Sequence, residues 1–166
     1  MTSARLTIKN QKGFTLIELL VVIGILAVLL AITLIAINPA KQFSQANNTK
    51  RRSDVNAILN AIDQYAADNK GALPTGLTAA ACTSAAPCTL SDDAAVAGHL
   101  DICSALVTKY LAALPVDPLT NNGTPVTDCT TTYNTNYTVY QASGGDNRIT
   151  VTAPAAELGE TISVTR

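Results

Sequence analysis

The chain has 166 residues, enough for one ordinary domain, with twelve acidic residues against eleven basic ones. Three of the basic residues lie within residues 1–13, so the rest of the chain carries a net charge of −4. This balance argues against a nucleic-acid binder, which would present a basic face. An enzyme is also disfavoured, because the only histidine, His99, has no nucleophile or carboxylate pattern beside it and no phosphate-binding Gly-x-x-x-x-Gly-Lys motif occurs.

A short basic segment at the N-terminus precedes an apolar run over residues 19–37. As a helix rising 1.5 Å per residue, this run crosses the ~30 Å hydrocarbon core of a bilayer. It is too long for the apolar part of a secretory signal, and no small-residue cleavage site follows it. The preceding basic residues place the N-terminus in the cytoplasm. One carboxylate, Glu18, stands at the start of the run, where it costs about 2.5–3.5 kcal/mol unless a partner compensates it.

The helical pattern continues beyond the apolar run. Pro39 predicts a kink or a short loosening of the helix rather than its end. An apolar stripe then recurs at helical spacing to about residue 69, with Gly71 and Pro74 as stop signals. The stripe comprises Val55, Ile58, Leu59, Ile62, Tyr65 and Ala66. The basic run over residues 50–52 is interpreted as a solvated helix face.

The second half of the chain begins as a loop over residues 71–90. A second helix is predicted from Ser91, a good N-cap, to about Leu114, because apolar residues follow at helical spacing and Pro115 ends them. Residues 115–136 read as a long connection. Strands are predicted at residues 137–142, 148–153 and 161–164, with a turn at residues 143–147.

Four cysteines all follow the apolar run: Cys82, Cys88, Cys103 and Cys129. If this half is exported, disulfides are the default interpretation, and four cysteines allow three connectivities. We favour Cys82–Cys88, which closes a small loop, and Cys103–Cys129, which ties the second helix to a later loop. A zinc site is disfavoured, because no Cys-x-x-Cys pair occurs and His99 has no partner.

These elements predict an α+β fold. A long N-terminal helix, apolar in its membrane half and amphipathic in its second half, packs on a small C-terminal head. The terminal strands pair antiparallel in the head and cover the apolar stripe of the helix.

The segment Lys12-Gly13-Phe14-Thr15-Leu16-Ile17-Glu18 resembles the processing site and mature N-terminus of type IV pilins and type II secretion pseudopilins. The resemblance covers residues 9–37 closely and the head only weakly. It implies a leader peptide (1–13), a transmembrane and filament-core half-helix (14–38), an amphipathic half-helix (39–70) and a globular head (71–166).

The resemblance also implies processing and partners. A prepilin peptidase would cut between Gly13 and Phe14 and N-methylate Phe14, and the resulting amine would pair with Glu18 of a neighbouring subunit. Its other partners would be copies of itself and other pilins, an inner-membrane assembly platform and, before assembly, the bilayer. The protein would be a single-pass inner-membrane protein that then enters an extracellular pilus or a periplasmic pseudopilus.

Two departures from the family pattern concern Pro39, which lies later than the usual helix proline, and Leu119, where pseudopilins often have an aromatic residue. No cofactor is expected. Asp117, Asp128 and Asp146 are possible calcium ligands, but no EF-hand-like spacing joins them, so turn-forming and solvated roles are predicted for all three.

Three functions stay open at this point. The chain is a structural pilus subunit, or it is a type II secretion pseudopilin or minor pilin. Outside the family, it is a membrane-anchored extracytoplasmic binding domain, which would keep residues 1–13.

Overall fold

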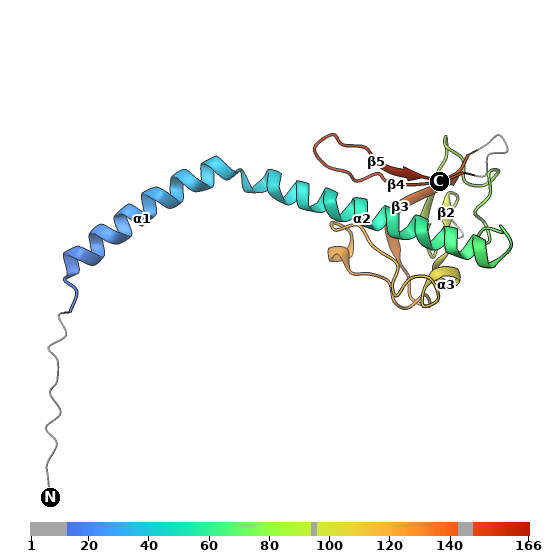
Figure 1. The fold of residues 1–166 in the computed structure, drawn as a ribbon, viewed down its shortest axis with the longest axis horizontal. Helices are drawn as coiled ribbons and strands as arrows, with labels where there is room; N and C mark the ends of the chain where they lie inside the picture. The colour runs from blue at the N-terminus through green and yellow to red at the C-terminus, as the bar shows by residue number, and fades with distance from the viewer. Residues whose placement is uncertain (1–12, 94–95, 143–147) are drawn as a thin grey trace, which may run out of the picture. The chain divides into compact units, whose positions relative to one another are not determined.

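The computed structural model describes residues 13–93, 96–142 and 148–166. The chain divides into two compact units, residues 1–42 and 43–166. In the first unit, helix α1 (Leu16–Ile37) has no buried residue. It is long and apolar enough to cross a membrane, as predicted. The second unit is the head (Figure 1).

The long helix is broken at Asn38. This residue has φ 47° and caps α1 in the left-handed conformation, and a second helix, α2 (Pro39–Asp68), begins at the next residue. The predicted kink or short loosening is therefore present as a break of one residue, Asn38, with helix on both sides of it. A residue before proline is disfavoured in the helical region, asparagine tolerates the left-handed one, and proline suits the first position of a helix.

Helix α2 ends where the sequence predicts. The amide of Gly71 donates to the carbonyl of Ala66 over 2.7 Å, and Gly71 has φ 87°, a left-handed conformation that closes the last turn. Val55, Ile58, Leu59 and Ile62 are fully buried, which confirms the apolar stripe.

The head contains one five-stranded sheet with strand order β2-β1-β3-β4-β5. The strands are β1 (Cys88–Ser91), β2 (His99–Leu100), β3 (Asn134–Gln141), β4 (Ile149–Ala153) and β5 (Ile162–Thr165). Among these five strands of the described residues, β1 and β2 pair in parallel and the other neighbours are antiparallel. The three predicted terminal strands are confirmed as β3, β4 and β5, and the predicted turn at 143–147 lies outside the described residues.

One hydrophobic core joins the sheet to α2. Val139 pairs with Val151, which pairs with Val164, so a row of branched side chains crosses the three terminal strands. Buried side chains of these strands and of β1 belong to the same cluster as the α2 stripe. The predicted α+β architecture is therefore correct for the head.

The predicted helix from Ser91 to about Leu114 is wrong. Ser91 ends β1, and the only α-helix here among the described residues is α3 (Cys103–Leu106). Gly98 and Thr108 adopt positive φ values of 84° and 70°, which a continuous helix excludes. Most of the apolar residues at helical spacing still reach the core, but from β2, α3 and tight turns.

Two disulfides close the loops of the head, with the pairing favoured from the sequence. Cys82–Cys88 closes a small loop with a Cα–Cα distance of 5.1 Å. Cys103–Cys129 ties α3 to the connection before β3 with a Cα–Cα distance of 5.5 Å. That connection contains the short 3-10 helix η1 (Asn121–Gly123).

Candidate functional site

The start of α1 is built around Thr15 and Glu18. Thr15 is the N-cap, and its side chain accepts from the Glu18 amide at 3.3 Å. The Glu18 carboxylate in turn accepts from the Thr15 amide at 2.8 Å and from its hydroxyl at 2.7 Å. This reciprocal capping box satisfies free amides of the first turn. It supplies hydrogen bonds to Glu18 but no opposite charge.

The residue pair at the predicted cut lies just outside α1. Gly13 and Phe14 are both exposed, and the Phe14 side chain is 84% exposed. A Cβ added to Gly13 would meet no heavy atom within 4 Å, so the fold itself does not require glycine there. Gly13, Phe14 and Glu18 thus occupy one short exposed segment at the start of the apolar helix α1.

The other candidate residues lie in the head. The four cysteines form the two disulfides. Asp128 is exposed and accepts from the amide and hydroxyl of Thr130, and the hydroxyl bond, the stronger effect, lowers the pKa of Asp128. Asp146 lies outside the described residues. Among the residues that the structure describes, no group of three or more His, Cys, Asp or Glu side chains could hold a metal ion.

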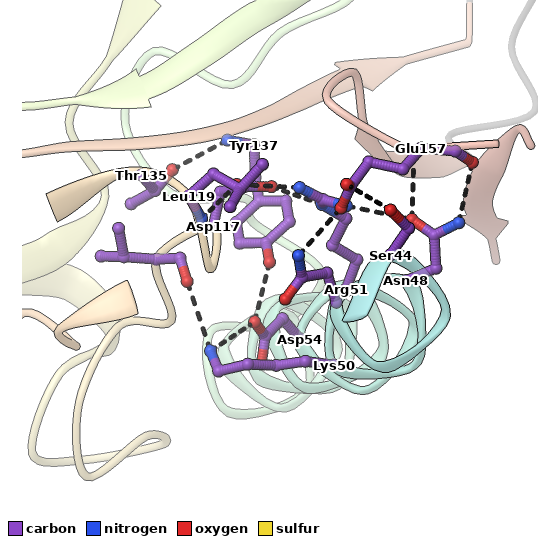
Figure 2. A network of polar contacts seen from close by, with 12 residues as sticks. Ser44, Asn48, Lys50, Arg51, Asp54, Asp117, Leu119, Thr135, Tyr137 and Glu157 are labelled. Atoms are coloured by element: carbon purple, nitrogen blue, oxygen red, sulfur yellow. Dashed lines mark hydrogen bonds and ion pairs between the residues drawn. The ribbon is translucent and has the colours of Figure 1, made fainter. Parts of the chain in front are cut away.

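Asp117 differs from its predicted role. It is fully buried and forms an ion pair with Arg51, whose side chain is also fully buried. Arg51 Nε donates to one Asp117 oxygen at 2.6 Å and Nη2 to the other at 3.2 Å (Figure 2). The predicted solvated role of Asp117 is therefore wrong, whereas its predicted turn is present, because it accepts from the amides of Leu119 and Thr120. The predicted solvated face of the basic run is wrong at Arg51.

Arg51 also binds the connection between β4 and β5. Its Nη1 donates to Glu157 at 2.7 Å and to Asn48 at 3.0 Å. Glu157 further accepts from Ser44 at 2.8 Å and from Asn47 at 3.0 Å. These donors, Arg51 first, lower the pKa of Glu157. One guanidinium thus joins α2 to two separate connections of the head.

A second set of contacts lies one turn along α2. The Tyr137 hydroxyl donates to Asp54 at 2.7 Å, and Lys50 donates to Asp54 at 3.0 Å and to the Val116 carbonyl at 3.3 Å (Figure 2). Burial, followed by the bond to Asp54, raises the pKa of Tyr137. The N-terminal part of α2 is therefore attached to the head by polar groups.

The sequence contained a signal for this network that hydrophobicity alone missed. The buried stripe of α2 at positions 62, 58 and 55 continues backwards at the same spacing to Arg51 and Asn48, and both of these are fully buried. The inward face of the helix could be extrapolated, but its partners Asp117 and Glu157, 66 and 106 residues away, could not.

Comparison with known proteins gives one family match. The Prokaryotic N-terminal methylation motif matches residues 8–34. The N-terminal part of the chain thus carries the methylation motif of type IV pilins and pseudopilins. Proteins of this family are structural and non-enzymatic, and the apolar helix α1 is consistent with a pilin held in the inner membrane before assembly.

One curated relative is the Type II secretion system core protein G of Pseudomonas aeruginosa, which is 41% identical over 61 residues. The alignment covers 37% of this chain and 42% of that protein, so it spans about two fifths of the relative's length. No solved structure was found to match the chain.

Proposed function

We propose that this pilin-family protein is the structural subunit of a type IV pilus-like filament. A prepilin peptidase removes residues 1–13 by cutting between Gly13 and Phe14, and Phe14 is then N-methylated. The methylation motif at residues 8–34 and the exposure of both residues beside α1 support this processing. The processed subunits assemble from the inner membrane with α1 in the filament core.

The observation that carries the proposal is the isolation of Glu18. It is the only charged residue of α1, and every described residue of that helix is exposed. Thr15 satisfies the carboxylate with hydrogen bonds and leaves its charge uncompensated. The α-amine created at Phe14 is largely cationic at neutral pH, and methylation keeps that charge. We infer that the Phe14 amine of one subunit pairs with Glu18 of its neighbour and sets their register.

Two substitutions separate the charge of Glu18 from its capping role. Glu18→Gln keeps a side chain that can complete the capping box, whereas Glu18→Ala removes both functions. We expect both variants to be cleaved and inserted, and both to lose filaments in electron micrographs of sheared cells. Normal filaments from Glu18→Gln would refute the proposed pair, and loss of filaments in Glu18→Ala alone would assign the requirement to the cap.

Processing is tested by the mass of the N-terminal peptide from sheared cells. A peptide that begins at N-methylated Phe14 in the released fraction supports a surface pilus. Processed peptide that stays with the membrane favours the second candidate, a type II secretion pseudopilin or minor pilin, for which the similarity to core protein G speaks. An intact leader on a stable, abundant protein would contradict both and leave a membrane-anchored binding domain.

A further inference from the structure

The head presents an apolar collar, by which we mean Phe43, Leu119 and Leu158. These side chains are 70%, 65% and 50% exposed, and in the described part of the head only one further large hydrophobic residue, Val96, is exposed. The segments that carry the three collar residues are all linked to Arg51 or its partners, as the contacts below show. Exposed large apolar side chains that share a region mark interaction sites more often than single scattered ones do.

The Arg51 network holds the collar together. Ser44, next to Phe43, donates to Glu157, which precedes Leu158. On the other side of the guanidinium, Asp117 accepts from the amide of Leu119 at 2.9 Å (Figure 2). The segments that carry the collar are thus tied to buried groups, so its exposure does not come from loose loops.

The chain length to α1 indicates what the collar meets. Residues 39–43 are helical and advance about 6 Å, and the two bonds from Ile37 to Pro39 add at most about 8 Å. Phe43 therefore lies within about 14 Å of the end of α1, whatever the angle between the two helices. The headgroup layer occupies about 5–8 Å outside the hydrocarbon core, so Phe43 lies in or next to that layer when α1 spans a bilayer.

The carboxylates beside Leu158 are held in ion pairs. Glu157 and Glu160 flank Leu158 and Gly159, and each is paired, Glu157 with Arg51 and Glu160 with Arg52. Both carboxylates of the connection between β4 and β5 therefore have a guanidinium partner, although Glu157 shares Arg51 with Asp117. Apolar area buried at the boundary between headgroups and acyl chains contributes to membrane binding.

We propose that the apolar collar is a lipid-binding surface, which inserts into the interfacial layer of the bilayer that α1 spans and holds the head on the membrane before assembly. The inference rests on the membrane-spanning part of the proposed function and is independent of the filament role. The nearness of Phe43 to α1 in the chain favours lipid over a second copy of the protein.

The absence of tryptophan from the sequence makes a direct test possible. Leu158→Trp and, separately, Phe43→Trp are introduced into the full chain and reconstituted at low density in phosphatidylethanolamine–phosphatidylglycerol vesicles. Val96→Trp is the matched control, an exposed hydrophobic position outside the collar. Leu29→Trp, in the middle of α1, reports insertion of the helix. Emission is recorded with aqueous iodide and with lipids that carry a quencher near the headgroup or deep in the chain.

The expected result is a blue shift, loss of iodide quenching and strong shallow-lipid quenching for both collar variants, with none of these for Val96→Trp. Collar variants that behave like Val96→Trp while Leu29→Trp is deeply quenched would overturn the proposal and leave the membrane span intact. If the collar tryptophans lose their protection from iodide when the protein is diluted in lipid, the collar binds a second copy of the protein. That result would also overturn the proposal. A Leu29→Trp without deep quenching would refute the membrane span itself, and the collar proposal with it.

Discussion

The Arg51–Asp117 ion pair allows a sharp prediction about the stability of the head. Both side chains are fully buried, and Arg51→Met fills most of the same space without the charge. Asp117 would then keep its hydrogen bond from the amide of Leu119. It would lose its two hydrogen bonds from the guanidinium, at 2.6 and 3.2 Å. Breaking a buried pair by removing one partner costs about 3–5 kcal/mol. For a domain of this size we expect the Tm to fall by roughly 10–20 °C.

The adjacent residue provides a matched control. Arg52 pairs with Glu160 at the surface, where the two side chains are 54% and 36% exposed. Exposed pairs contribute about 0–1 kcal/mol, so Arg52→Met should lower the Tm by only a few degrees. Thermal unfolding of the full chain in detergent, followed by near-ultraviolet circular dichroism of the tyrosines, measures both. Equal losses for the two variants would refute the reasoning.

A double variant tests whether the stranded charge causes the loss. The double variant Arg51→Met, Asp117→Leu removes both buried charges. Replacing a buried ion pair by apolar residues often leaves the stability almost unchanged. The double variant should therefore be more stable than Arg51→Met alone. If it is less stable, the loss comes from packing or from the Glu157 contact.

Three further predictions concern pH, the disulfides and processing. The pKa of Glu157 is lowered chiefly by its bond to Arg51, so its stabilising effect is complete above the ordinary value of 4.5 and is lost as the pH falls through the lower, folded value. Glu157→Gln should consequently lose less stability than the unmodified protein when its Tm is measured from neutral pH down to acid. Replacing Cys103 and Cys129 by alanine should cost about 3.5 kcal/mol in urea unfolding, and replacing Cys82 and Cys88 about 2 kcal/mol, because the loops close 26 and 6 residues; an equal cost would contradict the loop-closure account. Gly13→Ala should keep an unchanged fold by circular dichroism but retain the leader in the mass of its N-terminal peptide, since its Cβ meets nothing in the protein itself.

The sequence predicts best the elements that short-range periodicity determines. The apolar run appears as α1, the stripe at 55–62 is buried in α2, and alternating residues near the C-terminus form β3, β4 and β5. In each case the pattern repeats within a few residues and needs no distant partner. The start of α1 belongs to this group, because Thr15 and Glu18 are three residues apart and form a capping box.

The main error in the fold comes from a segment where local and long-range effects compete. Between Ser91 and Leu114 the spacing of apolar residues predicts a helix. The positive φ values of Gly98 and Thr108 interrupt it, and Ser91 belongs to strand β1. Tertiary pairing overrides a periodic pattern of this length.

The head is attached to α2 in two physically different ways. Around Val55 to Ile62 the contact is apolar and forms part of the core. Around Ser44 to Arg51 it depends on Glu157 and Asp117, whose hydrogen bonds and charges respond to acid and to single substitutions. Because local opening begins where apolar burial is least, the first turns of α2 should separate from the head before the core unfolds. Hydrogen exchange should therefore show earlier loss of protection at residues 44–51 than at 55–62 on acidification, and a simultaneous loss would mean that the two attachments form one cooperative unit.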